Sequence, residues 1–189
     1  MEMRRREKLA VFDLDGTLFD TTQVNYFSYQ AAAEQFGYEI AYEEFSKVFV
    51  GRNYKEFLPI LGVKEKETQE KIHETKKKKY AMFLERAKKN EHLFSVIPYM
   101  KEEYFLAVAT TASKRNAEEI LSCFKVKELF DFFITQEDVK NLKPDPECYL
   151  TAMKMAGIAA DRTLIFEDSD VGIAAARASG AAVFRIECF

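Results

Sequence analysis

The chain has 189 residues, of which 48% are hydrophobic, and a formal net charge of −3. A chain of this size can bury a sizeable core in roughly one to two domains. Its weak negative charge gives no reason to propose a nucleic-acid partner, and its apolar runs are far shorter than the ~18 residues needed to cross a bilayer.

The first eight residues are rich in charge and contain no apolar segment before a cleavage site. We therefore expect a charged arm that leads into the first strand, not a signal peptide, and a cytoplasmic protein. The three cysteines, Cys123, Cys148 and Cys188, are widely spaced and form no CxxC pattern. Reduced thiols are the simpler interpretation of such cysteines.

Two acidic residues follow the first predicted strand. The apolar run Leu9–Phe12 leads directly into Asp13 and Asp15. Because alternate side chains of an extended backbone share a face, both carboxylates would point at one small volume. A divalent cation, or a proton held between them, would relieve their repulsion. For this segment alone, a solvated Asp-Gly turn or a calcium loop is the alternative.

About ninety residues with a mostly helical pattern separate this strand from the next. Val24, Phe27 and Ala31 have helical spacing there. A long polar helix is predicted from about Glu65 to Asn90, and its run Lys76–Lys79 is expected to form a solvated face. The inward stripe of this helix would consist of Ile72, Tyr80, Phe83 and Ala87.

The second predicted strand covers residues 105–110 and ends in hydroxyl side chains that include Thr110 and Thr111. Barely two helical turns are expected between Pro98 and this strand. A helix is predicted directly after the hydroxyl cluster, over 114–121. Hydroxyl groups between a strand end and a helix start can bind phosphate, although capping the helix is the simpler role for them.

A third strand is predicted at 132–135, and a lysine in a restricted loop follows it. Lys143 lies beside Pro144 and close to Pro146, just ahead of a helix predicted over 147–156. Proline restricts its own backbone and that of the residue before it, so this cation would be held in place. A solvated loop lysine is the alternative.

A second acidic strand end comes next. The run 163–166 leads into Glu167 and Asp168, ahead of a helix of small residues at 172–179. With a last strand at 181–186, five strands alternate with helices, which predicts a parallel α/β sheet with right-handed crossovers. Helix N-capping is the alternative role for this acidic pair.

Taken in order, the four polar segments resemble the four sequence motifs of the haloacid dehalogenase-like (HAD) superfamily. The resemblance runs from about Leu9 to Ile186, and Phe166–Ala176 is especially similar to the branch of β-phosphoglucomutase and phosphoglycolate phosphatase. It implies a five-stranded parallel Rossmann-like sheet formed by residues 1–20 and 97–189, with an inserted α-helical cap domain at 21–96.

The resemblance also implies roles for the acidic residues. The first Asp of the first motif attacks phosphorus in the superfamily, so Asp13 would form an aspartyl-phosphate. Asp15 would protonate the leaving oxygen and later activate water. Mg²⁺ would be bound by Asp13 and Asp15 together with Asp168 and Glu167, with Asp168 as a direct ligand and Glu167 acting through water.

The remaining site residues come from the other motifs and from the cap. Thr110 and Lys143, with Thr111 beside them, would hold the transferring phosphoryl group. Arg52 would be a candidate for contacting substrate, although a surface arginine is an equally good interpretation. Asn25 occupies the cap position at which the β-phosphoglucomutase family has a histidine base.

Several classes of function compete. A Mg²⁺-dependent phosphatase acting on a small phosphorylated metabolite needs only the four motifs and water. A sugar phosphomutase also needs a proton-transferring base in the cap, which Asn25 cannot be, and a noncatalytic protein would not need the acidic residues. A dehalogenase is disfavoured because that branch does not keep the acid found here at Asp15. We therefore expect the phosphatase, with no nucleic-acid or membrane partner, as a monomer or homodimer.

Overall fold

A computed structural model describes residues 6–49, 52–187 and 189 of the chain. The chain divides into two compact units, one formed by Met1–Asp20 with Lys88–Phe189 and the other by Thr21–Ala87. We refer to the first as the core unit and to the second as the cap unit. The second junction lies between Ala87 and Lys88, whereas the sequence predicted it between residues 96 and 97.

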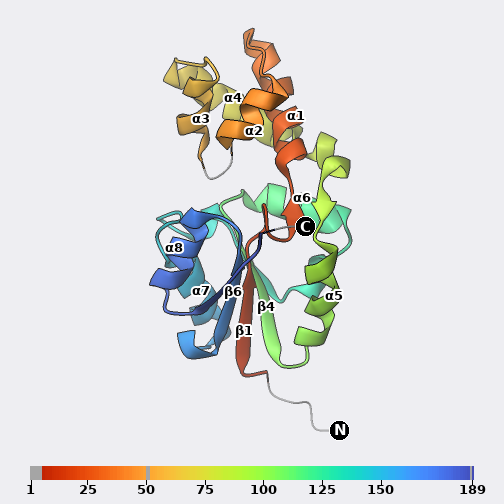
Figure 1. The fold of residues 1–189 in the computed structure, drawn as a ribbon, viewed down its shortest axis with the longest axis vertical. Coiled ribbons are helices and arrows are strands. Elements are labelled where there is room, and N and C mark those ends of the chain that lie inside the picture. The colour runs from red at the N-terminus through yellow and green to blue at the C-terminus, as the bar shows by residue number, and fades with distance from the viewer. Residues whose placement is uncertain (1–5, 50–51, 188) are drawn as a thin grey trace. The chain divides into compact units, whose positions relative to one another are not determined.

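The core unit contains a five-stranded sheet in which all neighbouring strands are parallel. The spatial order is β5 (Phe132–Ile134), β4 (Tyr104–Ala109), β1 (Lys8–Phe12), β6 (Thr163–Glu167) and β7 (Ala182–Arg185) (Figure 1). In the central strand β1, Phe12 pairs with Val108 of β4 on one side and with Phe166 of β6 on the other. The predicted α/β class and five-stranded parallel sheet are confirmed.

Helices cover both faces of this sheet, which explains why its central strands are apolar along their length. α7 (Glu147–Ala156) and α8 (Asp170–Ala178) lie on one face, and α5 (Glu91–Met100) lies on the other (Figure 1). α6 (Lys114–Cys123) follows β4 in the chain. Both the predicted helix at 147–156 and the one at 114–121 are present.

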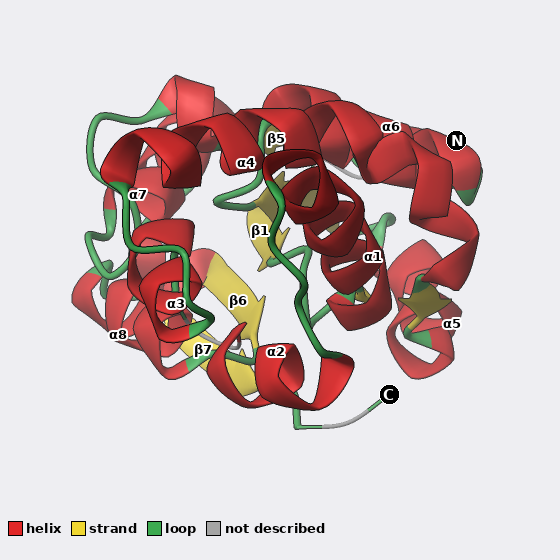
Figure 2. Ribbon diagram, turned by 90° about the horizontal axis from the view of Figure 1, so that it is seen from above, coloured by secondary structure: helices red, strands yellow, loops and turns green. Residues whose placement is uncertain are grey.

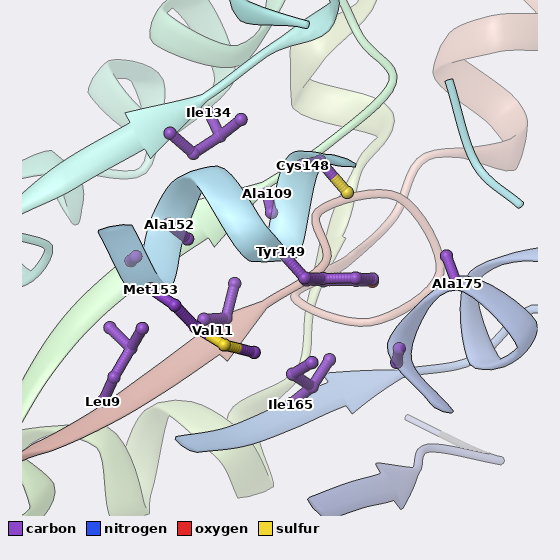
Figure 3. Close-up of a cluster of buried hydrophobic side chains, with 12 residues drawn as sticks. Leu9, Val11, Ala109, Ile134, Cys148, Tyr149, Ala152, Met153, Ile165 and Ala175 are labelled. Atoms are coloured by element: carbon purple, nitrogen blue, oxygen red, sulfur yellow. The ribbon is translucent and has the colours of Figure 1, made fainter. Parts of the chain in front are cut away.

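A cluster of buried side chains fills the space between the sheet and α7 (Figure 3). Leu9 and Val11 of β1 and Ile165 of β6 meet Tyr149 and Met153 of α7 there. The two β1 residues are separated by one position, as expected for side chains on one face of a strand. This packing holds α7 against the sheet and therefore fixes the start of the helix that follows Lys143.

Two observations concern the environment of the chain. Among the helices within the described residues, none combines the length and the apolar character needed to cross a membrane. Cys123 and Cys148 carry free thiols, and Cys188 lies outside the described residues.

Helix α5 is longer than the two turns predicted upstream of β4. It begins at Glu91 because the side chain of Asn90 caps it, accepting a hydrogen bond from the Leu93 amide at 3.2 Å. Pro98 lies inside the helix near its end. Asn90 also donates its Nδ2 hydrogen to the Thr17 carbonyl at 3.1 Å, which ties the start of α5 to the core unit.

Two short strands flank the cap unit in the sequence, one just before it and one just after it. β2 (Phe19–Asp20) pairs antiparallel with β3 (Lys88–Lys89), with Phe19 opposite Lys89. Together with the bonds of Asn90, this pairing places the residues after Ala87 in the core unit. No strand was predicted at these positions, because each strand is only two residues long.

The cap unit is built from helices joined by loops (Figure 2). They are α1 (Thr22–Ala33), α2 (Tyr42–Phe49), α3 (Tyr54–Ile60) and α4 (Lys66–Lys79). Aromatic rings dominate its interior. Phe45 is fully buried, and its ring centroid lies 6.0 Å from that of Tyr29 and 5.6 Å from that of Phe57.

The long polar helix predicted from Glu65 to Asn90 is wrong in its second half. α4 ends at Lys79, and a 3₁₀ helix over Tyr80–Arg86 follows it. Three residues of the predicted inward stripe are buried: Ile72, Tyr80 and Ala87. Phe83 is only half-buried, whereas the next residue, Leu84, is buried. The change to a 3₁₀ helix shifts which residues point inward.

The lysine run Lys76–Lys79 was expected to form a solvated face. Lys78 is exposed as expected, but Lys76 is not. Lys76 is buried, with its Nζ 5.2 Å from the ring centroid of Tyr29 and 4.7 Å from that of Tyr80. Aromatic faces attract a cation, so the two rings offset part of the cost of burying this charge.

His73, also on α4, has its ring enclosed by two tyrosines. Its ring stacks on Tyr54 with centroids 3.9 Å apart, and its Nδ1 lies 2.7 Å from the hydroxyl of Tyr29. Burial lowers the pKa of His73 to about 3, and the positive charges of Lys76 and Lys77 add to this effect. The folded protein therefore holds this imidazole neutral near pH 7.

This neutral histidine should make stability depend on pH. The folded-state pKa of about 3 lies below the unfolded value near 6.5, so the stabilisation is complete above pH 6.5 and is lost as the pH falls toward 3. For one such proton, the free energy of unfolding changes by at most about 1.4 kcal/mol per pH unit. We expect the difference in free energy of unfolding between wild type and His73→Asn, measured by urea denaturation, to shrink from pH 7 to pH 5. A constant difference over this range would contradict the assignment.

Candidate active site

The polar segments identified in the sequence meet at one edge of the sheet. Asp13 follows β1, Thr110 follows β4, and Glu167 is the last residue of β6. Lys143 lies in the connection between β5 and α7. In the sheet, β4 and β5 lie on one side of β1, and β6 and β7 lie on the other. The strand order therefore changes direction at β1, and in α/β sheets ligands bind at such a point, outside the carboxyl ends of the strands.

Lys143 lies at the centre of this group. Its side chain is 5% exposed, and its Nζ is 2.6 Å from Oδ1 of Asp13 and 2.7 Å from Oε2 of Glu167. The same ammonium donates to the Ala109 carbonyl at 3.1 Å, so its three hydrogens have three acceptors. Burial alone would lower the pKa of Lys143, but the charges of Asp13 and Glu167 outweigh it and hold this pKa well above its usual range.

The carboxylate of Glu167 is surrounded by donors. Its Oε2 accepts hydrogen bonds from Lys143 and from the hydroxyl of Tyr149, the latter at 2.7 Å. Its Oε1 accepts from the amide and the hydroxyl of Ser169, at 3.1 and 2.9 Å. Burial would raise the pKa of Glu167, but the Lys143 charge and these hydrogen bonds hold it below its usual range. Glu167 is therefore an ionised carboxylate with donors on both oxygens.

Asp13, Glu167 and Asp168 form an acidic cluster that could hold a metal ion. One carboxylate oxygen from each lies within 4.8 Å of the others. Burial and the Glu167 charge raise the pKa of Asp13 well above its usual range, although Lys143 opposes them. Burial and the same Glu167 charge raise the pKa of Asp168 to about 6. A cation bound by these oxygens, the ligand type that Mg²⁺ prefers, would remove this repulsion.

Two glycines allow backbone segments to approach these carboxylates. Gly16 has φ +91°, and a Cβ there would overlap the carboxylate of Asp168. A Cβ at Gly172, in the first turn of α8, would overlap the carboxylate of Glu167. Thr17, next to Gly16, donates its hydroxyl hydrogen to Oδ1 of Asp168 at 3.1 Å. The turn after β1 thus fits closely around Asp168, and the start of α8 around Glu167.

The other predicted site residues of the core unit, Asp15, Thr110 and Thr111, differ in exposure. Asp15 is half-buried in the turn after β1, and it does not belong to the acidic cluster. Thr110 is buried, and its hydroxyl oxygen accepts a hydrogen bond from the Ala112 amide at 3.0 Å. Thr111 is exposed.

The two predicted cap residues have partners inside the cap unit. Asn25 is buried, and its Nδ2 donates to the carbonyl and the hydroxyl of Thr21, at 3.1 Å each. Arg52 is exposed and donates to the Val48 carbonyl at 3.1 Å.

Tyr149 and Ser169 contact the site but were not singled out from the sequence. Ser169 precedes a predicted helix, and its hydroxyl caps α8 by accepting from the Gly172 amide at 3.0 Å. That N-cap signal could have been recognised, whereas Tyr149 is indistinguishable in sequence from a core residue of α7.

Comparison with known proteins identifies the family. The model of the family described as "Haloacid dehalogenase-like hydrolase" matches residues 10–186. The chain belongs to this family. A "Phosphorylated carbohydrates phosphatase" of Thermotoga maritima is 32% identical to it over 178 residues, which cover 90% of this chain and 81% of that protein.

Other members of the HAD family match most of the chain as well. The "Beta-phosphoglucomutase" of Bacillus subtilis is 26% identical over 185 residues, which cover 92% of this chain and 80% of that protein. The crystal structure of CbbY from Rhodobacter sphaeroides in complex with phosphate has a TM-score of 0.83 at 24% identity, over 96% of this chain and 87% of that one. The branch suggested by Phe166–Ala176 is thus represented among the relatives.

The acidic cluster leads to a prediction about metal binding. We expect Asp168→Ala to weaken the binding of Mg²⁺ by more than about tenfold in isothermal titration calorimetry, because Mg²⁺ depends on few protein carboxylates. Asp170→Ala is the matched control, since this acid is two residues away, exposed, and paired with Arg185. Equal Mg²⁺ affinities of the two variants would show that Asp168 is not a ligand.

Proposed function

We propose that this HAD family member is a Mg²⁺-dependent phosphomonoester hydrolase that acts on a small phosphorylated metabolite through an aspartyl-phosphate. The observation that carries the proposal is the buried contact of Lys143 with Asp13 and Glu167, at 2.6 and 2.7 Å, beside Asp168. A carboxylate can attack an anionic phosphoryl group where fixed cations and donors neutralise the phosphoryl oxygens. The cluster supplies a fixed cation next to a carboxylate.

In the first displacement, a carboxylate oxygen of Asp13 forms a bond to phosphorus while the bond between phosphorus and the ester oxygen breaks. Asp15 gives a proton to that ester oxygen, so that a neutral alcohol leaves. Both residues lie in the same short turn after β1, which brings the nucleophile and the acid to one substrate. Lys143, already in contact with Asp13, would bind the phosphoryl oxygens with Thr110 and the neighbouring Thr111.

In the second displacement, water replaces Asp13. Asp15 accepts a proton from the water while the water oxygen forms a bond to phosphorus. The bond between phosphorus and the Asp13 oxygen breaks at the same time. Inorganic phosphate leaves, and both acids return to their starting protonation states. Splitting the hydrolysis in this way replaces one difficult step by two easier ones.

Mg²⁺, when bound, would neutralise part of the charge on the phosphoryl oxygens. Asp13 and Asp168 would be its direct carboxylate ligands, and Asp15 would contribute from the same turn. Glu167 would act through water, because both of its oxygens already accept hydrogen bonds from protein donors.

A sugar phosphomutase is the second candidate, because the Bacillus subtilis mutase matches 92% of this chain. A mutase must return the phosphoryl group to a sugar hydroxyl, and the family's cap histidine serves as the base for that proton. Asn25 stands at the matching position, and its amide cannot accept a proton near neutral pH. The phosphatase proposal is therefore the stronger of the two.

Assays of phosphate release and of glucose 6-phosphate formation separate these candidates. With Mg²⁺, the wild type should release inorganic phosphate from an aryl phosphate. With β-glucose 1-phosphate and a trace of the bisphosphate, it should yield at most inorganic phosphate. Rapid formation of glucose 6-phosphate with little free phosphate would establish the mutase, and no reaction with the aryl phosphate or any of a panel of sugar phosphates, nucleotides and phosphoglycolate would favour a noncatalytic protein.

The Asp13→Asn variant tests the nucleophile by its release of phosphate from the aryl phosphate. Asp161→Asn is the matched control, because Asp161 is an exposed acid of the core unit. The Asp13 variant should lose activity by a factor on the order of 10⁴ or more, since an amide cannot attack phosphorus. The Asp161 variant should keep the wild-type rate.

A further inference from the structure

Tyr149 contacts both ionic partners at the centre of the site but has no role in the two displacements. Its side chain is fully buried, and its hydroxyl donates to Oε2 of Glu167 at 2.7 Å. The centroid of its ring lies 5.0 Å from Nζ of Lys143. In Figure 3 the side chain extends from α7 toward β6 and α8. This residue therefore touches Glu167 with its polar end and faces Lys143 with its ring.

We propose that Tyr149 is a positioning residue that fixes Glu167 and thereby keeps Lys143 available to Asp13 and to the phosphoryl group. This inference rests on the proposed phosphatase function. It assigns to Tyr149 an effect on the reaction that is separate from its packing in the core.

Lys143 and Tyr149 share one acceptor atom. Oε2 of Glu167 accepts from both Lys143 and Tyr149, at 2.7 Å each. A carboxylate oxygen with a second donor attracts the ammonium less strongly than one paired with the ammonium alone. Removal of the Tyr149 hydroxyl would leave Lys143 as the sole partner of a buried, charged oxygen. The ammonium would then be drawn toward Glu167 and away from Asp13.

Hydrogen bonds also hold the segment that carries Lys143 and Tyr149. The carboxylate of Glu147, at the start of α7, accepts hydrogen bonds from the amides of Lys140 and Asn141, at 2.9 and 2.8 Å. The amide of Glu147 in turn donates to Oδ1 of Asp145 at 2.9 Å. The loop around Lys143 is thus tied to the helix on both sides of the lysine. Because Tyr149 is anchored in the core from this same helix, its ring gives Lys143 a fixed neighbour.

The alternative is that Tyr149 acts through packing alone. Its neighbours Val11, Ile165 and Ala175 are apolar and buried, and a phenylalanine would fill the same space. The Tyr149→Phe variant therefore separates the two roles, because it removes the hydroxyl and keeps the ring. Tyr29→Phe is the matched control, since Tyr29 is also buried and its hydroxyl bonds to His73 in the cap unit.

The first measurement is turnover of an aryl phosphate at saturating Mg²⁺, at a temperature where thermal melts show every variant folded. Residues that orient a metal site from outside typically change activity or affinity by 10- to 100-fold, so kcat of Tyr149→Phe should fall by about tenfold or more. Tyr29→Phe should stay within about twofold of wild type, the scatter expected of a change outside the site. A kcat of Tyr149→Phe within this same twofold range would overturn the proposal.

The second measurement does not depend on activity. The dissociation constant of Mg²⁺ is determined by calorimetry for the wild type, Tyr149→Phe, Glu167→Gln and the double variant. If Tyr149 acts through Glu167, its substitution weakens Mg²⁺ binding in the wild type but has little further effect beside Glu167→Gln. The same factor in both backgrounds would contradict the proposal. A wild type that binds Mg²⁺ with this coupling but hydrolyses no phosphate ester would refute the phosphatase function and leave the coupling between Tyr149 and Glu167 established.

Discussion

A buried ammonium between two buried carboxylates is the interaction on which the rest of the site depends. Lys143 is 5% exposed, and its contacts with Asp13 and Glu167 bring together residues that are 130 and 24 positions away from it in the chain. Charges removed from water are stable where they are paired and hydrogen-bonded, and removal of one partner typically costs about 3–5 kcal/mol. The structure meets this requirement with three acceptors for the ammonium and the ring of Tyr149 beside it.

The sheet supplies the geometry for that arrangement. The central strand β1 delivers Asp13, its neighbour β6 delivers Glu167, and the loop before α7 delivers Lys143. Ser169 and Tyr149 then fix the glutamate from the two helices on the same face. A site on strand ends and helix starts is held more rigidly than one on long loops, as positioned charges in phosphoryl transfer require.

The sequence predicted the parts that depend on local pattern. The apolar runs located all five strands, and the proline-bounded segment before Glu147 located α7. Contacts between distant segments account for other features: Asn90, which caps α5, is also bonded to the Thr17 carbonyl, and the ring of Tyr29 lies against the buried Lys76. Tyr149 was missed for the same reason, because its hydroxyl acts on a residue 18 positions away.

Trapping the phosphoenzyme tests the central claim most directly. The protein is quenched during turnover, treated with borohydride, which reduces an acyl phosphate to an alcohol, and examined by peptide mass spectrometry. The account predicts homoserine in place of Asp13 in the wild type and none in Asp13→Asn. Reduction at Asp15 or Asp168 instead, or phosphate release at full rate with no reduced residue at any time point, would contradict a mechanism in which Asp13 carries the phosphoryl group.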